Sequence, residues 1–409
     1  MEKRICIGLK ITLSSWKQTL AYLFIAALVV RILFIVTLQE GFYFSDSVSY
    51  DAAAVNLLAK GEFGLNYDRP PVYALFLAGI YFLFGKSIFA VRIVQAIMGA
   101  VIAVIMAIIG KRVAGQKVGA LAGALWSIYP LGVFIAGIVY SETVVATLLA
   151  CGVMSLITDQ NKRLGPKSVL VGGIIFGAAA LTKSVVLITI SAIALWLFSW
   201  ERSRRIMFPC LFLVGVSLLL IPWTIHNFYI YGQLVPLSPR DSKEVAAKLH
   251  GSPNLISAKE RSIKASIDHL VHLTGHFGRE FLHYWQLYPD TVVMSDPVYR
   301  ENAHKKNSRI VRKTLFGTEI TTLVSIVSVG SMFLFGLIGT GIMWSHKEKR
   351  RVLSLFYIMI LSVAIGHTPF GNKIRYRVPI EPYIIILCAY GLWQTWVAIS
   401  GRYLVDRKV

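Results

Sequence analysis

The sequence has few cysteines and few charged residues, and each shortage excludes a class of protein. Its 409 residues include four cysteines, none of them in a CxxC pair, so neither a disulfide scaffold nor a thiolate metal site is expected. Only 15% of the residues are charged and 56% are apolar, whereas soluble chains average about 25% charged and roughly 45–50% apolar residues. The composition therefore excludes a disordered chain and an ordinary soluble enzyme, and it predicts a membrane protein.

Nucleotide-binding sequences are also missing. There is no Walker A sequence and no GxGxxG at a strand–helix turn, so ATP-driven transport has no support. The net charge of +21 does not indicate a nucleic-acid partner, because nearly half of the basic residues lie in six short groups that flank the apolar runs and no groove-binding motif is present. The N-terminus has no small-residue cleavage site, so its first apolar run is expected to be a retained transmembrane helix.

Ten apolar stretches approach the length that crosses a ~30 Å hydrocarbon core. Six clusters of Lys and Arg flank them, and such clusters stay on the cytoplasmic side of a membrane. All six face the cytoplasm only if a further apolar run, 70–84, does not cross. We therefore predict that 70–84 is an amphipathic or re-entrant segment at the outer surface. The ten predicted spans are 19–38, 90–110, 118–138, 143–158, 168–182, 184–200, 206–224, 320–344, 352–366 and 378–399.

These patterns predict an all-α polytopic membrane protein with two large extracytoplasmic loops. A transmembrane module is expected over residues 1–225, with its first outer loop at 39–89. Residues 226–318 are expected to form an extracytoplasmic loop domain, and residues 319–409 the C-terminal transmembrane helices.

Ionisable residues at membrane depth are costly and usually functional, and here they gather at the outer ends of the predicted helices. Such a mixture of acids and bases suits a lipid-phosphate substrate, because the cations can hold the phosphate while a carboxylate acts as a base. The sequence therefore predicts an outward-facing site built from several loops. Its candidate residues are Asp46, Asp51, Asp68, Arg69, Glu142, Lys183, Arg375 and Arg377.

Several charged residues also have plain structural interpretations. Asp46 could cap the helix predicted for SDSVSYDAAAVNLLAKGEF, and capping and catalysis are about equally favoured. Asp51 fits a solvated position on the same helix. For Arg69, phosphate binding and snorkelling to the interface are comparably supported. Arg31 and Glu381, inside the first and last spans, are expected to form structural pairs or to line the cavity.

Seven of the nine histidines lie in the long predicted outer loop. Four of them fall on one helical face. Metal ligation needs convergent side chains and an acidic or thiolate partner, so packing of this face on the bilayer surface or on a neighbouring helix is favoured. The four residues are His269, His272, His276 and His283.

Short segments in a fixed order cover almost the whole chain. They are Asp46 followed by Tyr50, DRPPVYALFLAGIYFLFG (68–85), AVR (90–92), YPLGVFIAGIVYSET (129–143), ALTKS (180–184), PWTIHNFYIYGQLVPLS (222–238) and RYRVPIEPY (375–383). Together they resemble the bacterial polyprenyl-phosphate-sugar-dependent GT-C glycosyltransferases, which are related to the protein O-mannosyltransferases and the lipid A aminoarabinose transferase. The large outer loops of that family fall where the charge pattern places them.

The resemblance implies a GT-C fold and transfer of a hexosyl or pentosyl group from an undecaprenyl-phosphate type donor. The acceptor would be extracytoplasmic, such as lipid A, a glycan, a lipid or a protein. Asp46 would be the catalytic carboxylate for an inverting attack. The protein would lie among the lipids of the bacterial inner membrane, with its site facing the periplasm or the cell exterior. The substrate-binding residues implied are Tyr50, Arg69, Glu142, Lys183, Arg375 and Arg377.

No cofactor is required by the resemblance, but one branch of the family can bind zinc through an acidic residue and two outer histidines. By this resemblance, Asp68, His226 and His367 would hold a divalent metal such as zinc. His226 also stands where many members carry an arginine.

Two alternative functions stay open at this point. One is a lipid-linked-sugar flippase, which predicts charges spread through the bilayer and pseudo-symmetric halves, and the sequence has neither. The other is a polyprenyl-lipid-binding membrane protein without catalysis. Retention of the acidic and basic candidates Asp46, Arg69 and Glu142 argues against it.

Overall fold

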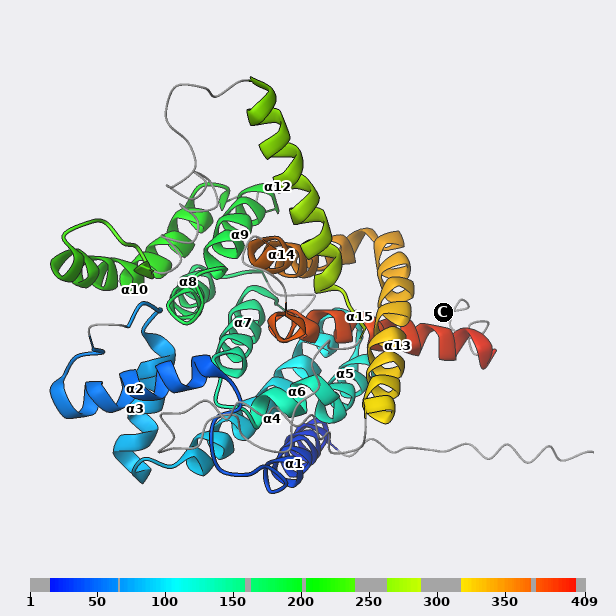
Figure 1. Ribbon diagram of the computed structural model, residues 1–409. Helices are drawn as coiled ribbons and strands as arrows, with labels where there is room; N and C mark the ends of the chain where they lie inside the picture. The colour runs from blue at the N-terminus through cyan, green and yellow to red at the C-terminus, as the bar shows by residue number, and fades with distance from the viewer. Residues whose placement is uncertain are drawn as a thin grey trace, which may run out of the picture.

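The computed structural model describes residues 15–64, 67–158, 163–200, 204–239, 263–287, 318–368 and 373–401. The regular structure of these residues consists of helices, most of them gathered in one bundle (Figure 1). Those before residue 200 are α1 (Trp16–Ile35), α2 (Ser45–Lys60), α3 (Val72–Phe84), α4 (Ile88–Ala114), α5 (Gln116–Ile128), α6 (Pro130–Ala136), α7 (Glu142–Leu156), α8 (Pro166–Ala180) and α9 (Val186–Trp200). Those after it are α10 (Met207–Tyr231), α12 (Ile263–Tyr284), α13 (Thr318–Ser345), η2 (Lys347–Lys349), α14 (Arg350–His367), η4 (Ile374–Arg377) and α15 (Glu381–Ile399).

The helices confirm a polytopic membrane protein. Six of those described contain a stretch long and apolar enough to cross a membrane, namely α1, α4, α10, α13, α14 and α15, and the bent pair α5–α6 would make a seventh span. Every predicted span falls on a helix, but α7, α8 and α9 have 15 residues each, or about 22 Å at 1.5 Å per residue. Because that length is short of a ~30 Å hydrocarbon core, the count of ten spans stays a prediction.

The chain breaks between α5 and α6, whose axes differ by 56°. Tyr129, the residue at the break, has a non-helical backbone with ψ at 117°. The proline ring that follows disfavours the helical conformation of the residue before it and removes one N–H donor. One helix therefore ends here and another begins at Pro130, which carries the chain through 137–141 into α7.

Close packing between α13 and α15 depends on glycine. Gly339 of α13 lies against the carbonyl of Leu387, and Gly391 of α15 lies against the carbonyl of Phe335. A Cβ atom at either glycine would overlap the facing carbonyl oxygen. Small residues let helix backbones approach in a bilayer, where lipid gives no hydrophobic driving force between helices. This contact fixes α15 against α13.

The apolar run 70–84 contains α3, which packs against α2. Asp51 of α2 joins the two, since it accepts a hydrogen bond from the Tyr81 hydroxyl at 2.8 Å and pairs with Lys86 Nζ at 3.2 Å. The solvated position expected for Asp51 is therefore wrong, because the residue is only 7% exposed. The 13 residues of α3 extend about 20 Å. Their placement at the outer surface stays a prediction.

The charged residues inside the first and last spans are structural, although they do not pair with each other. Arg31 is fully buried and donates to the carbonyl of Ser127 at 3.3 Å, which holds α1 to the end of α5. Glu381 is fully buried as well, lies 2.7 Å from Arg377 Nε and accepts a hydrogen bond from the Tyr129 hydroxyl at 2.8 Å. A buried charge needs such partners because it has lost its contact with water.

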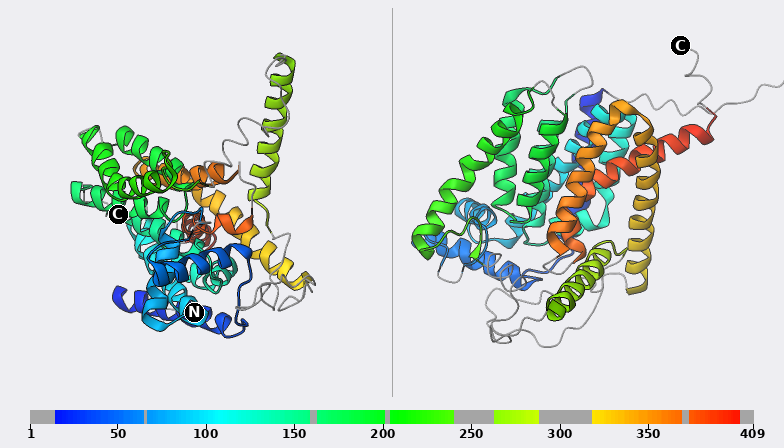
Figure 2. Two further views of the ribbon diagram at one scale, coloured as in Figure 1. Left: turned by 60° about the vertical axis from the view of Figure 1, so that its left-hand side comes forward. Right: turned by 90° about the horizontal axis from the view of Figure 1, so that it is seen from above.

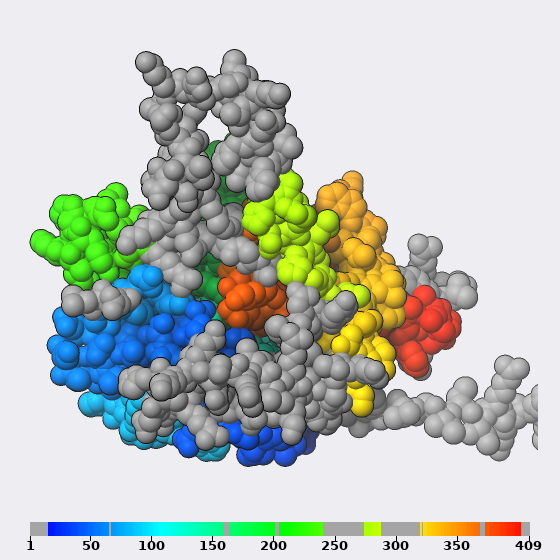
Figure 3. All heavy atoms as spheres, viewed as in Figure 1, coloured from blue at the N-terminus to red at the C-terminus, as the bar shows by residue number. Residues whose placement is uncertain are grey.

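The helix α12 projects from the bundle and is attached by its C-terminal end (Figure 2). The buried Tyr284 donates to the carbonyl of Tyr376 at 3.1 Å, and Arg377 donates to the carbonyl of Gln286 at 2.7 Å. The short helix η4 is thus tied to α12 on one side and to α15 on the other. In the space-filling view, an orange surface from the last part of the chain lies between α2–α3 (blue) and α12 (yellow-green) (Figure 3).

Candidate functional site

Five of the predicted site residues meet in one cluster, although they come from five separate segments. Asp46 lies in the first turn of α2, and Glu142 is the first residue of α7. Lys183 lies in the turn between α8 and α9, and Arg375 lies in η4. Arg69 precedes α3, whose first amide, that of Val72, donates to the carbonyl of Leu181 at 3.0 Å. This bond ties the start of α3 to the turn that carries Lys183.

Asp46 is held by two arginines and a tyrosine. Its Oδ1 lies 2.8 Å from Arg69 Nη2, and its Oδ2 lies 3.5 Å from Arg375 Nη2 and accepts a hydrogen bond from Tyr140. Burial raises the pKa of Asp46, but the hydrogen bond from Tyr140 and the charges of Arg69 and Arg375 outweigh it and hold the pKa below its usual value. The helix cap is Phe44, so capping does not account for Asp46.

Glu142 is the second carboxylate of the cluster. It is fully buried, and its Oε1 lies 2.9 Å from Lys183 Nζ and 3.6 Å from Arg375 Nε. Its Oε2 has no hydrogen-bond partner among the described residues. Arg375 therefore bridges Asp46 and Glu142. Three cations against two carboxylates leave the cluster with one net positive charge.

Aromatic rings cover the cations of the cluster. Arg69 lies over the ring of Tyr50 at 5.0 Å, and Lys183 lies over the ring of Tyr376 at 4.3 Å. Arg375 lies 4.5 Å from the centre of the Tyr140 ring. Such contacts attract a cation electrostatically. They place Tyr50, the remaining predicted substrate-binding residue of the first outer loop, beside the cluster.

Arg377 was predicted to bind substrate, but the structure does not bring it into the cluster. Its side chain is fully enclosed, pairs with Glu381 and donates to backbone carbonyls at the end of α12. Since η4 is a 3₁₀ helix with about three residues per turn, a residue two positions after Arg375 points to a different side. The contacts of Arg377 in this structure are therefore structural ones, and a part in substrate binding stays a prediction.

The three residues proposed for zinc do not meet. His226 stacks on Trp223, with ring centres 4.9 Å apart, and the buried His367 stacks on Tyr376 at 4.4 Å. Within the part of the chain that the structure describes, no three His, Cys, Asp or Glu side chains are arranged to hold a metal ion. The described residues therefore hold no common site made of Asp68, His226 and His367. The two histidines pack on separate rings, His226 on Trp223 and His367 on Tyr376.

Sequence reasoning did not single out Tyr140, which the structure places at the centre of the cluster. It is 3% exposed, donates to Asp46 and accepts a hydrogen bond from Arg375 Nη2 at 2.8 Å. The only signal in the sequence was the place of Tyr140 in the segment 129–143. That signal is weak, because tyrosines are common near membrane interfaces and their position alone does not indicate a contact with a charged residue.

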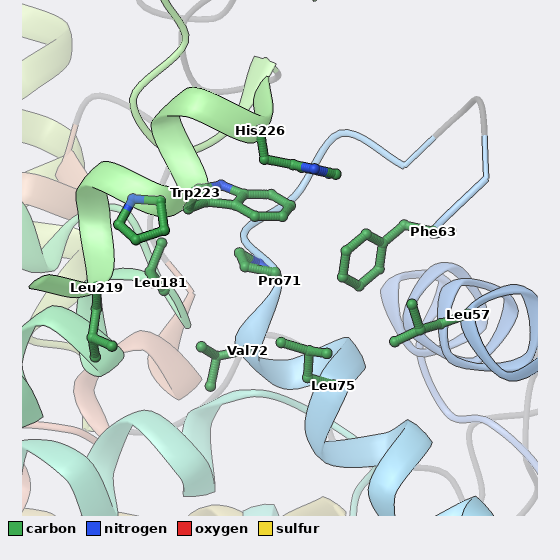
Figure 4. Close-up of a pocket in the computed structure, with 10 residues that line it drawn as sticks. Leu57, Phe63, Pro71, Val72, Leu75, Leu181, Leu219, Trp223 and His226 are labelled. Atoms are coloured by element: carbon green, nitrogen blue, oxygen red, sulfur yellow. The ribbon is translucent and has the colours of Figure 1, made fainter. Parts of the chain in front are cut away.

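A groove lined by apolar side chains lies next to the cluster. It has a volume of about 440 Å³, and its lining includes Pro71, two residues after Arg69, and Leu181, two residues before Lys183. Trp223 and His226 of α10 lie on one side of the groove and Phe63 on the other, above side chains of α3 (Figure 4). The complete lining is Leu57, Phe63, Pro71, Val72, Leu75, Leu181, Leu219, Pro222, Trp223 and His226.

Comparison by sequence gives one family. Residues 68–226 match the model of the dolichyl-phosphate-mannose-protein mannosyltransferases. Among curated proteins, no sequence match was found. The matched region begins at the segment before α3 and ends in α10, so it contains Arg69, Glu142 and Lys183 of the cluster.

Comparison by structure gives relatives that cover nearly all of the chain. One is ArnT from Cupriavidus metallidurans bound to undecaprenyl phosphate, with a TM-score of 0.58 and 16% identity over 93% of this chain and 61% of that one. Another is the archaeal oligosaccharyltransferase AglB from Archaeoglobus fulgidus, in complex with an inhibitory peptide and a dolichol-phosphate, with a TM-score of 0.59 and 12% identity over 96% and 52%. The chain thus spans about half to three fifths of their lengths. The predicted resemblance is confirmed, and the chain is a membrane protein with the GT-C fold.

Proposed function

We propose that the protein is an integral membrane glycosyltransferase that moves a sugar from a polyprenyl phosphate to an extracytoplasmic acceptor. The observation that carries this proposal is a cluster of three cations and two carboxylates beside an apolar groove. Support also comes from ArnT and AglB, which were solved with undecaprenyl phosphate and with a dolichol-phosphate.

The cluster and the groove match the two halves of such a donor. Arg69, Lys183 and Arg375 supply a positive field for a phosphate, and the bidentate guanidinium groups suit its oxygens. The apolar groove begins two residues from Arg69 and from Lys183, so an isoprenoid chain could lie in it while its phosphate reaches the cations. Burial of apolar surface favours that arrangement by about 25 cal/mol per Å².

The reaction needs one bond to break and one to form at the anomeric carbon of the sugar. The bond between this carbon and the phosphate oxygen breaks, and the phosphate leaves with the electron pair. Arg69, Lys183 and Arg375 would stabilise the charge that grows on it. The acceptor oxygen forms the new bond from the opposite side, which inverts the configuration, and its proton passes to Asp46.

The resting contacts of Asp46 explain how it could become a base only when substrate is present. Arg69 and Arg375 now lower its pKa, and a carboxylate with a low pKa is a weak base. A donor phosphate would compete for the same two guanidinium groups. Asp46 would then lose part of the interaction that lowers its pKa, and its basicity would rise.

The site would face the periplasm or the exterior of a bacterial cell. Lys111 and Arg112 lie in the last turn of α4, which is its C-terminal end. They begin one of the basic loops. Glu142, by contrast, opens α7, and Lys183 follows the end of α8. The cluster thus lies at helix ends opposite those that carry the basic loops, and basic loops stay in the cytoplasm.

A transfer assay tests the proposal. Protein purified in detergent is incubated with radiolabelled polyprenyl-phosphate sugars and a membrane extract that supplies acceptors. Asp46→Asn should lower the rate by about 10²–10⁴-fold, the usual effect of losing a positioned base. Asp51→Asn is the matched control on the same helix, because asparagine can still accept the hydrogen bond from Tyr81; its rate should stay near that of the wild type.

Two results would contradict the proposal. Equal transfer by the wild type and by Asp46→Asn would remove Asp46 from the reaction. Binding of polyprenyl phosphate without consumption of any sugar donor would favour the flippase or the non-catalytic lipid-binding protein.

A further inference from the structure

We propose that Tyr140 is a positioning residue that holds Asp46 and Arg375 in register for the transfer reaction. Its hydroxyl donates to Asp46 Oδ2 and accepts from Arg375 Nη2 at 2.8 Å. A tyrosine hydroxyl has one proton to donate and lone pairs to accept, so both contacts can exist at once. The kinetic part of this inference rests on the proposed function.

The ring of Tyr140 has little freedom to move. It packs edge-to-face on Phe44 at 5.5 Å and on Tyr50 at 6.3 Å, and Arg375 covers it at 4.5 Å. Aromatic pairs in this geometry are favourable beyond the area that they bury. The hydroxyl is therefore directed at Asp46 by the packing of its own ring.

The backbone that carries Tyr140 is also fixed. Ser47 of α2 donates to the carbonyl of Val139 at 2.7 Å, and Gln95 of α4 donates to the carbonyl of Ile138 at 2.6 Å. Both donors are fully buried. The segment before Tyr140 is thus bonded to the same helix that carries Asp46, which keeps the distance between the two residues constant.

Several charged and titratable groups face Asp46 and bear on its protonation. Burial raises the pKa of Tyr140 above its usual value, so its hydroxyl keeps its proton and stays a donor. Removal of the Tyr140 hydroxyl would leave Asp46 with only Arg69 and Arg375 as partners and would raise the pKa of the Asp46 carboxyl. Asp46 itself contacts Arg69 before α3, Tyr140 before α7, and Arg375 on η4. The charged and titratable groups beside these partners are Tyr50 on α2, Glu142 at the start of α7 and Lys183.

Kinetics of Tyr140→Phe in the full chain test the inference. We expect kcat to fall about 10-fold, the lower end for a supporting hydrogen bond, while KM for the donor stays within about 2-fold because the cations remain. The acid limb of the kcat/KM profile should move up by about one pH unit. Tyr383→Phe is the control, since its buried hydroxyl has no partner among the described residues.

A double-mutant cycle gives a readout that does not need transfer. Thermal unfolding in detergent is compared for the wild type, Tyr140→Phe, Asp46→Asn and the double variant. If Tyr140 acts on Asp46, its substitution should change the unfolding midpoint less in the Asp46→Asn background. Additive effects, or an acid limb that does not move, would overturn the inference.

The outcomes remain separable from those of the proposed function. If the wild type transfers no sugar, the proposed function fails and the thermal cycle alone decides the role of Tyr140. If Tyr140→Phe does not fold, Tyr140→Leu, which also lacks the hydroxyl and keeps an apolar side chain at the site, replaces it in both experiments. Failure of both variants to fold would overturn a positioning role in favour of a purely structural one.

Discussion

Two arginines that are close in the sequence, Arg375 and Arg377, have different roles in the structure because their partners differ. Arg375 lies between the two carboxylates of the cluster, whereas Arg377 is buried and pairs with Glu381. The sequence places both in one short outer segment, and nothing in the residue types separates them. The separation comes from the three-residue turn of η4, which no apolar periodicity could reveal.

Removing the charge of Arg69 should weaken binding of the lipid phosphate. A hydrogen bond to a charged group contributes about 1.5–3 kcal/mol, so Arg69→Gln should raise the Kd for undecaprenyl phosphate by about 10- to 100-fold. A binding titration on the purified protein measures this. Lys86→Gln, which removes a half-exposed cation paired with Asp51, is the control, and an equal loss in both variants would contradict a specific role for Arg69.

Acid should destabilise the protein through Asp46. Its folded pKa lies below its usual value, so its contribution to stability is fully present above the unfolded pKa of about 3.9 and is lost as the pH falls through the folded pKa. Between about pH 5 and about pH 3, the Tm of the wild type should therefore fall more than that of Asp46→Asn. Parallel curves for the two proteins would show that Asp46 makes no such contribution.

At the scale of helices, the apolar runs predicted where the membrane helices lie along the sequence, but they did not predict how the helices break or which of them pack together. Each predicted span contains a helix because a long apolar run has few other stable conformations in lipid. The break at Pro130 and the burial of Asp51 were not predicted, because they depend on which helices become neighbours. Asp51 looked solvated from its own helix, but α3 brings Tyr81 and Lys86 to it.

The attachment of α12 should depend on Arg377. Arg377→Met would leave Glu381 buried without its cation, and breaking a buried ion pair costs about 3–5 kcal/mol. We expect a large fall in the unfolding midpoint and faster proteolysis of the segment around α12. Arg377→Met combined with Glu381→Met should recover much of the loss, since apolar replacement of a whole buried pair is often neutral. A double variant no more stable than the single one would contradict the ion-pair explanation.

At the scale of the whole molecule, the charge distribution along the sequence grouped five residues that the fold brings into one cluster. The basic loops and the ionisable cluster fall at opposite helix ends, so Asp46, Arg69, Glu142, Lys183 and Arg375 could be grouped from the sequence. The contact between Asp46 and Tyr140 could not be predicted, since the two residues are 94 positions apart. It depends on the bend between α5 and α6, which carries 137–141 to the start of α2.

The bonds from α12 to η4 have a mechanical consequence. Tyr284 and Gln286 hold the residues that follow Arg375, and η4 is only four residues long. A tilt of α12 would therefore move η4, and with it the Arg375 guanidinium, because few residues lie between them. A molecule that binds α12 from outside would therefore change the distance between Arg375 and Asp46 through η4.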